Sequence, residues 1–488
     1  MTLDRAAVAA AVRAIDLEDL ASRRWFVAKG DVPSSARLAH AFALGPDAAL
    51  ALVDVSGGER GDRRDRYAIP FVVGDGEVRE AAEGGGAWRA LAAAIGEGRT
   101  IPSMARDAGS AIGPVEAALV CRPSPGFVDL WPGPLADLAT AEEAPLGRDQ
   151  SNTSTVIGGR LLLKAYRRIQ PGLNPDLELT AYLSEERGFG GVPRLAGWAE
   201  VVTRDGGAAT VAMLQAFVPD ADDVYERTAE FLADLVAAPG SVSLEWATEV
   251  AADLGTLVAG LHAALVSPPS DAPDLAPRTA THDELKAWRL DAHRNLNLAI
   301  PAVSAVDAEA GAELKRDAAA IAARVSRFEA VATAPLVMRI HGDLHLGQLL
   351  TGEDGYRVVD FEGEPIRPIE DRRRPESPLR DVASMLRSLD HVARSARRRA
   401  ERRTGGPIAR PGLDVEAWIE RSRERFLAGY ADGLRRAGAP ITLDLDLLEA
   451  FEVAKEAYEL LYAATLLPSW LWAPRAGMRW LLERGEAA

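Results

Sequence analysis

Two acidic residues seventeen positions apart, with a strong turn signal between them, constrain the fold of this chain more than any other feature. Asp343 lies in the stretch RIHGDLHLGQ, and Asp360 ends the stretch YRVVD. Between them, two short strand-like runs flank the turn sequence TGEDG at 351–355. A hairpin there doubles the chain back. We therefore expect Gln348, at its start, and Asp360, at its end, to lie on the same side as the loop that carries Asp343.

This arrangement indicates a magnesium site beside a catalytic carboxylate. Mg²⁺ prefers oxygen ligands and usually takes only one or two from protein, which predicts Gln348 and Asp360 as its ligands. Asp343 is the predicted catalytic base, because a carboxylate near bound phosphates can accept a hydroxyl proton. Gln348 follows Asp343 by five residues, the spacing of kinase-type catalytic loops. The alternative is that both aspartates only cap the hairpin.

Two histidines flank the same aspartate. His341 and His345 have the spacing of a helical metal pair, but no third ligand is near and the loop contains Gly342 and Gly347. We therefore expect structural hydrogen bonds from these histidines, and for His345 a contact with the substrate.

An upstream hairpin supplies residues suited to nucleotide phosphates. The sequence SNTSTVIGGRLLLK predicts two strands around the Gly158-Gly159 turn, and Lys164 ends the second, apolar strand. Glu178, on a helix expected to begin near Pro175, is the predicted charge partner of Lys164, as in kinases. The alternatives are a solvated strand end for Lys164 and an exposed helix carboxylate for Glu178. The small polar residues predicted to cover the phosphates are Ser151, Asn152, Thr153 and Ser154.

The segment MLQAFVP at 213–219 could form a link whose backbone binds adenine. Its candidate contacts are Gln215, Phe217 and Val218. The alternative is an ordinary strand end.

Length and composition predict a multidomain globular protein. The chain has 488 residues, of which 48% are apolar and 26% charged, a balance typical of ordinary soluble proteins. Strand signals dominate before residue 224 and helical ones after it. We expect an N-terminal cap domain at 1–120, a nucleotide-binding lobe at 121–220, and a helical lobe with the catalytic loop and sugar site at 221–488.

Charge and hydropathy favour a small substrate in a cytoplasmic protein. The net charge of −16 disfavours nucleic acid, which requires clustered Lys and Arg. No stretch reaches about 18 uncharged apolar residues, and no secretory signal is visible, so we expect no membrane contact. The basic cluster at 394–403 is expected to be an exposed helix face and end. The single cysteine, Cys121, is expected to be a buried apolar residue.

Taken in order, these motifs resemble the bacterial maltokinase-like sugar kinases, which are similar in fold to aminoglycoside phosphotransferases and protein kinases. Close matches include WFVAKG at 25–30, KAYRRIQPGLNP at 164–175, DFEGEP at 360–365 and LRDVASMLRS at 379–388. The resemblance implies an α+β, bilobal kinase-like fold with an N-terminal α/β cap and a mostly helical C-terminal lobe. It also implies ATP and Mg²⁺ as cofactors, Asp343 as catalytic base, Gln348 and Asp360 as magnesium ligands, Lys164 as an ATP-phosphate contact and Glu362 as a substrate contact.

The C-terminal segment departs from the maltokinase pattern. Where maltokinases have an arginine before Pro-x-Trp, this chain has Leu467, which disfavours maltose because buried polar contacts provide much of substrate discrimination. The segment looks more like that of the actinobacterial glucosamine kinases. Glu456 and Glu459, one helical turn apart, could receive an ammonium group, and Trp470 or Trp472 could stack on a pyranose. The alternative is that the tryptophans belong to the core.

The sequence therefore predicts an ATP-dependent sugar kinase that forms glucosamine 6-phosphate from glucosamine, as a monomer or weak dimer. Maltokinase, forming maltose 1-phosphate, is the alternative within the class. A non-catalytic kinase-fold protein that binds nucleotide or sugar is the alternative from another class. Aminoglycoside resistance is a further alternative, which the 120-residue cap disfavours.

Overall fold

The chain divides into two compact units, Met1–Asp220 and Ala221–Ala488. The structure is a computed structural model, and it describes residues 3–23, 25–26, 32–57, 63–105, 116–147, 152–267, 276–363 and 368–484. Within these ranges, no helix combines the length and the apolar character needed to cross a membrane.

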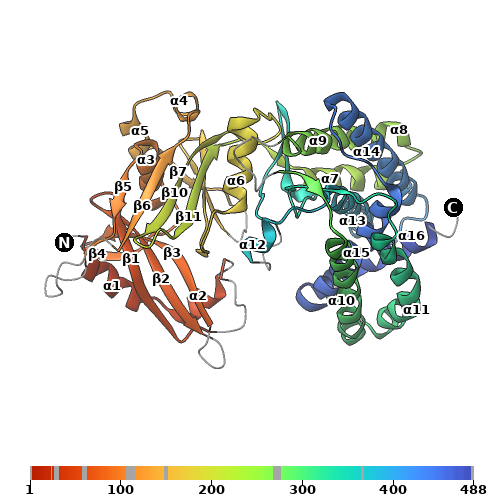
Figure 1. Cartoon of the computed structure of the whole chain (residues 1–488), viewed down its shortest axis with the longest axis horizontal. Coiled ribbons are helices and arrows are strands. Elements are labelled where there is room, and N and C mark those ends of the chain that lie inside the picture. The colour runs from red at the N-terminus through yellow and green to blue at the C-terminus, as the bar shows by residue number, and fades with distance from the viewer. Residues whose placement is uncertain are drawn as a thin grey trace. The chain divides into compact units, whose positions relative to one another are not determined.

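The first unit begins with an antiparallel four-stranded sheet in the order β1-β2-β3-β4. Helices α1 (Arg5–Arg13) and α2 (Leu17–Ser22) cover one face of this sheet, where Val8, Val12 and Leu20 join a core with alternate residues of β2 (Figure 1). The bounds are β1 Ser35–Ala43, β2 Ala48–Gly57, β3 Arg63–Gly74 and β4 Glu77–Glu80.

A seven-stranded sheet follows, in the order β5-β6-β10-β11-β9-β8-β7. Helix α3 (Ala87–Gly96) packs against it and against the second face of the four-stranded sheet, so one continuous core joins both sheets. The expected boundary at residue 120 lies inside β6. Cys121 is buried in this core, as expected, and burial raises the pKa of its thiol to about 12. The bounds are β5 Thr100–Pro102, β6 Ala117–Pro123, α4 Phe127–Leu130, α5 Leu135–Thr140, β7 Glu143–Pro145, β8 Thr153–Ile157, β9 Leu161–Ala165, β10 Leu195–Thr203 and β11 Ala208–Ala216.

The upstream hairpin and its helix form as the sequence predicted. Strands β8 and β9 pair across the Gly158-Gly159 turn, where both glycines have positive φ. Helix α6 (Pro175–Ala181) has Pro175 in its first turn, and the Asn174 side chain accepts a hydrogen bond from the Asp176 N–H. A π-helical turn, Tyr182–Glu186, ends it.

The second unit is mostly helical, as expected, and holds two small sheets (Figure 1). The predicted hairpin after Gln348 is β15 paired with β16, and β12 pairs with β15. The helices are α7 Val224–Ala237, α8 Leu244–Ala247, α9 Glu249–Leu265, α10 His282–Val306, α11 Ala308–Val325, α12 Ile369–Arg372, α13 Pro378–Thr404, α14 Val415–Ala437, α15 Leu445–Leu466 and α16 Trp472–Arg484. The strands are β12 Asp222–Asp223, β13 Arg278–Thr279, β14 Leu336–Val337, β15 Leu349–Gly352 and β16 Gly355–Val358.

Helices α9 and α14 pack with their backbones close together because glycines face the contact. A Cβ atom on Gly255 would lie 2.1 Å from the Phe426 carbonyl oxygen, and one on Gly429 would lie 2.2 Å from that of Ala252. Gly433 faces the Ala259 methyl group in the same way. These glycines are required for the approach of the two helices, despite the lower helix propensity of glycine.

Gly255→Ala is expected to lower the free energy of unfolding by about 1–3 kcal/mol, because overpacking a close backbone contact outweighs the gain in helix propensity. Thermal and denaturant unfolding would measure the change. Gly406→Ala is the matched control, since a Cβ there meets nothing within 4 Å. Equal stability of the two variants would contradict this account of the α9–α14 contact.

Candidate active site

Lys164 of β9 is held in place by a buried carboxylate of the first unit. Its side chain is 10% exposed, and Nζ lies 2.7 Å from Oδ2 of Asp176, which also accepts a hydrogen bond from the Tyr166 hydroxyl at 3.0 Å. The sequence singled out Glu178 and missed Asp176, two residues before it on α6. The pairing of Lys164 with Glu178 stays a prediction.

The polar front end of β8 borders a cavity inside the first unit. Asn152, Thr153 and Ser154 line this cavity, which has a volume of about 690 Å³. Ser154 lies opposite Lys164 in the strand register. Ser151 lies outside the described residues. A cavity beside these side chains is compatible with their predicted contact with phosphates.

The link after β11 has one backbone N–H already bonded within the first unit. The Phe217 N–H donates to the Arg160 carbonyl at 2.8 Å, and the contact predicted between Phe217 and adenine stays a prediction. Val218 is half-buried, and no backbone hydrogen bond involves its N–H within the described part of the chain. Gln215 is buried at 6% exposure on β11. Val218 is therefore the better candidate for a backbone contact with a base.

In the second unit, Asp381 of α13 fixes the loop that carries Asp343. Its carboxylate is 1% exposed and accepts the backbone N–H of His341 at 2.8 Å and of Gly342 at 2.9 Å. His262 of α9 donates to the same carboxylate at 3.3 Å. Burial alone would raise the pKa of Asp381, but the hydrogen bond and charge of His262 outweigh it and hold the pKa below 3.8.

Both loop histidines form hydrogen bonds with the backbone. Nδ1 of His341 accepts the Asp343 N–H at 3.3 Å, while its Nε2 contacts the Val359 carbonyl at 3.0 Å. Nδ1 of His345 accepts the Gly347 N–H at 3.1 Å, and burial lowers its pKa, so the ring is neutral with its proton on Nε2. The structural role expected for both histidines is therefore observed.

Gln348 and Asp360 lie side by side at the ends of the hairpin, as the sequence predicted. Gln348 Nε2 donates to Asp360 Oδ2 at 3.3 Å, and the Val359 N–H donates to the Gln348 carbonyl at 3.0 Å. Asp360 has a φ of 68°, a conformation that costs a non-glycine residue about 1–3 kcal/mol and is concentrated at functional sites. Two neighbouring oxygen-bearing side chains on a strained backbone fit a hard cation.

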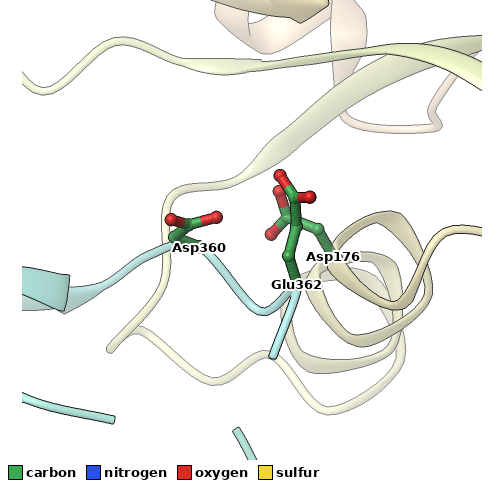
Figure 2. A group of neighbouring side chains, drawn as sticks. All are labelled: Asp176, Asp360 and Glu362. Atoms are coloured by element: carbon green, nitrogen blue, oxygen red, sulfur yellow. The ribbon is translucent and has the colours of Figure 1, made fainter. Parts of the chain in front are cut away.

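Figure 2 labels two more carboxylates. Glu362 lies two residues after Asp360, on the segment that follows β16, and Asp176 lies on α6. Arg372 Nη1 donates to the Glu362 carbonyl at 3.0 Å and lies 3.8 Å from its carboxylate, which is 16% exposed. The contact predicted between Glu362 and substrate stays a prediction.

Lys455 of α15 contacts the predicted catalytic base and was missed by the sequence analysis. Its Nζ lies 3.6 Å from Asp343 Oδ1 and 3.2 Å from Glu459 Oε1. Its four-residue spacing from Glu459 is the sequence signal that could have identified Lys455. Lys455 also lines a small cavity of about 50 Å³ with Tyr458 and with Asp291 of α10. Lys455 therefore joins Asp343 and Glu459 in one group of charges.

Glu456 is part of the interior, which corrects the prediction that it receives the sugar. Its side chain is 0% exposed, Arg387 donates to Oε1 at 3.4 Å, and His391 Nε2 lies 3.2 Å from the same atom. Burial lowers the pKa of His391, but the charge of Glu456 outweighs it and raises the pKa overall. Gly477 of α16 closes over the carboxylate, since a Cβ there would lie 2.1 Å from Oε1.

Trp470 is half-buried and not part of the core. Its ring meets that of His391 edge-on at 6.0 Å and that of Trp472 at 5.2 Å. Arg398 stacks over Trp472 at 4.0 Å. The stacking of Trp470 on a sugar stays a prediction.

Asp381→Asn is expected to destabilise the protein by about 3 kcal/mol and to lower turnover, because a neutral amide cannot accept both loop N–H groups and the proton of His262. Since the folded pKa of Asp381 is lowered, its contribution is present above about pH 3.8 and lost on acidification below it. Thermal unfolding at pH 7 measures the effect. Asp354→Asn, on the exposed β15–β16 turn, is the control; a wild-type melting temperature for Asp381→Asn would contradict the role of this carboxylate.

Similarity to known proteins extends over nearly the whole chain. A glucosamine kinase from Streptacidiphilus jiangxiensis is 30% identical over 465 residues, which span 92% of this chain and 95% of that protein. A glucosamine kinase from Mycolicibacterium smegmatis is 30% identical over 345 residues, 71% of this chain and 81% of that protein. No protein-family model matches the chain.

Solved structures agree with the sequence relatives. A glucosamine kinase in complex with glucosamine, ADP and inorganic phosphate is 27% identical, covers 99% of this chain and 100% of its own, and superposes with a TM-score of 0.70. A second crystal form of glucosamine kinase is 26% identical, with 97% and 99% coverage and a TM-score of 0.72. The predicted α+β kinase-like fold is confirmed, and the chain belongs to the glucosamine kinase family.

Proposed function

We propose that this chain transfers the γ-phosphoryl group of ATP to glucosamine and forms glucosamine 6-phosphate. The observation that carries the proposal is the loop of Asp343, fixed by Asp381 and joined to the neighbouring Gln348 and Asp360. Membership of the glucosamine kinase family supports the substrate. The glucosamine and ADP in the solved relative support a sugar and a nucleotide as the two reactants.

The residues proposed for the nucleotide lie in the first unit. Lys164, held by Asp176, would neutralise phosphate charge, and Asn152, Thr153 and Ser154 would donate to phosphate oxygens from the edge of their cavity. Because Asp176 fixes the ammonium group of Lys164, little side-chain freedom remains to be lost when ATP binds.

The residues proposed for magnesium and for the acceptor lie in the second unit. Gln348 and Asp360 would hold Mg²⁺, which, when bound, neutralises charge on the phosphate oxygens. Asp343 would accept the proton of the sugar hydroxyl as the new O–P bond forms and the bond between the γ-phosphorus and the β–γ bridging oxygen breaks, which leaves ADP. His345, neutral and with its Nε2–H directed away from the backbone contact, would donate to a sugar oxygen.

Recognition of the amino group is proposed for Glu459. Once Glu456 is assigned to the interior, Glu459 remains as the partly exposed carboxylate of that pair, with 21% of its side chain exposed. Lys455 bridges it to Asp343, so the ammonium of glucosamine would join an existing group of alternating charges. A neutral sugar lacks this attraction.

Asp343→Asn is expected to lower kcat by about 10²- to 10⁴-fold, the contribution typical of a general base, and to leave ATP affinity nearly unchanged. Coupled ADP release with ATP, Mg²⁺ and glucosamine measures turnover, and titration with a non-hydrolysable ATP analogue measures binding. Asp354→Asn is the control for loss of one surface carboxylate. Turnover near the wild-type rate would overturn the assignment of the base.

Glu459→Gln is expected to raise the KM for glucosamine about tenfold, because an ion pair worth about 1.4 kcal/mol corresponds to that factor. The KM for glucose, which has no ammonium group, should change much less. Wild type and variant are compared by ADP release with glucosamine, glucose, N-acetylglucosamine and maltose. A wild-type preference for maltose would reject the proposed substrate, whereas equal effects on glucosamine and glucose would reject only the role of Glu459.

A further inference from the structure

A second cavity lies within the first unit, and its volume is about 950 Å³. One wall consists of strands β1, β2 and β3, and the other consists of the segment 168–171 and the turn end of the β10–β11 hairpin. It shares no lining residue with the cavity beside Asn152, Thr153 and Ser154.

The strand register arranges arginines on the cavity wall in two rows. Arg37, Asp54 and Arg66 lie directly opposite one another on the three adjacent strands. Two residues further along, Ser35, Ser56 and Arg64 form the next row. Because directly opposed residues, and residues two apart on one strand, share a face of a sheet, both rows face the cavity that all six residues line.

The positive charges on this wall exceed the negative ones. The cavity is lined by four arginines, Arg37, Arg64, Arg66 and Arg168, and by two aspartates. Asp54 is occupied by Arg66, at 2.6 and 3.0 Å, and Asp65 by Arg168, at 3.0 and 2.9 Å.

Arg37 and Arg64 carry the excess positive charge of the cavity wall. Both are exposed, and neither has an ion pair or side-chain hydrogen bond with any residue in the described ranges. Two unneutralised guanidinium groups therefore border one cavity in a chain whose net charge is −16. We call Arg37, Arg64, Arg66 and Arg168 the arginine wall.

The chemistry of the arginine wall suits an oxyanion such as a phosphate group. A guanidinium group presents a planar fork of N–H donors that binds two phosphate oxygens at once, and it keeps its charge at any physiological pH. Ser35 and Ser56 place hydroxyl groups in the row of Arg64. The side chain of Asp54 is 46% exposed and stands beside Arg66, where its carboxylate suits the hydroxyl groups of a sugar.

We propose that the arginine wall binds the phosphate monoester of a small sugar, at a site distinct from those proposed for ATP and for the sugar acceptor. Arg37 and Arg64 hold the phosphate group, and the volume of the cavity accommodates the attached sugar. Such a site would let a phosphorylated sugar act on an enzyme that itself makes one.

Binding to the full chain tests the proposal. Titration calorimetry is performed with ADP and glucosamine present at saturating concentrations, so that the proposed nucleotide and acceptor sites are filled. The probes are glucosamine 6-phosphate, glucose 6-phosphate and inorganic phosphate. We expect the sugar phosphates to bind more tightly than inorganic phosphate, and their affinity to fall as the salt concentration rises.

The double variant Arg37→Ala/Arg64→Ala is expected to weaken sugar-phosphate binding at least tenfold. Its turnover of glucosamine without added sugar phosphate should equal that of wild type, because neither arginine belongs to the proposed catalytic machinery. Arg13→Ala, an exposed arginine at the end of α1, is the matched control and should bind as wild type does.

Three results would overturn the proposal: no binding of either sugar phosphate at millimolar concentration, undiminished binding by the double variant, or inorganic phosphate binding as tightly as the sugar phosphates. Melting temperatures show that the double variant is folded, since both side chains are exposed. If the wild type did not phosphorylate glucosamine, the proposed function would be rejected. The binding test of the arginine wall would be unaffected by that result.

Discussion

The geometry of the candidate active site in the second unit depends on one buried carboxylate. Asp381 accepts two consecutive backbone N–H groups of the loop before Asp343, and His262 supplies its third partner. The other ring nitrogen of His262, Nδ1, lies 2.9 Å from the Tyr430 hydroxyl. Burial raises the pKa of Tyr430, so this hydroxyl keeps its proton. A relay of three side chains thus joins α14, α9 and α13 to the catalytic loop.

The glycines between α9 and α14 are part of the same constraint. Gly429 precedes Tyr430, and a Cβ on Gly255 would lie 2.9 Å from the Tyr430 backbone nitrogen. The close backbone approach therefore sets the distance over which Tyr430 reaches His262. The packing of helices that are distant from the loop in sequence therefore determines where the carboxylate of Asp381 lies.

Local sequence was enough to predict the parts of the site that are built by nearby residues. The turn signal at 351–355 predicted a hairpin, and the hairpin does bring Gln348 to Asp360. The Gly158-Gly159 turn likewise predicted the strand that ends at Lys164. Asp381 was not predicted, because an acidic residue in the first turn of a helix usually caps that helix, and its true partners lie 39 and 40 residues earlier.

The sequence missed Asp176 and misplaced Glu456 for the same physical reason. Helical spacing shows which residues share a face, but the choice between neighbours depends on what packs against that face. Asp176 and Glu178 both follow Pro175, and only tertiary packing shows that Asp176 is buried and contacts Lys164. Glu456 and Glu459 differ because α16 brings Gly477 against the first and leaves the second partly exposed. No local pattern contains that information.

The net charge of the chain argues against large polyanionic partners, but it does not decide whether a small anion binds. Of the arginines of 394–403, Arg399 and Arg403 are neutralised by Glu226 and Glu230 of α7, so that basic run offers less free charge than its sequence suggests. On the wall of the larger cavity the reverse holds, because Asp54 and Asp65 are occupied by Arg66 and Arg168 and leave the charges of Arg37 and Arg64 unneutralised. The potential that a small anion meets is set over roughly one Debye length, about 8–10 Å, and not by the total charge of −16. An acidic chain can therefore exclude polyanions and still hold a single phosphate group.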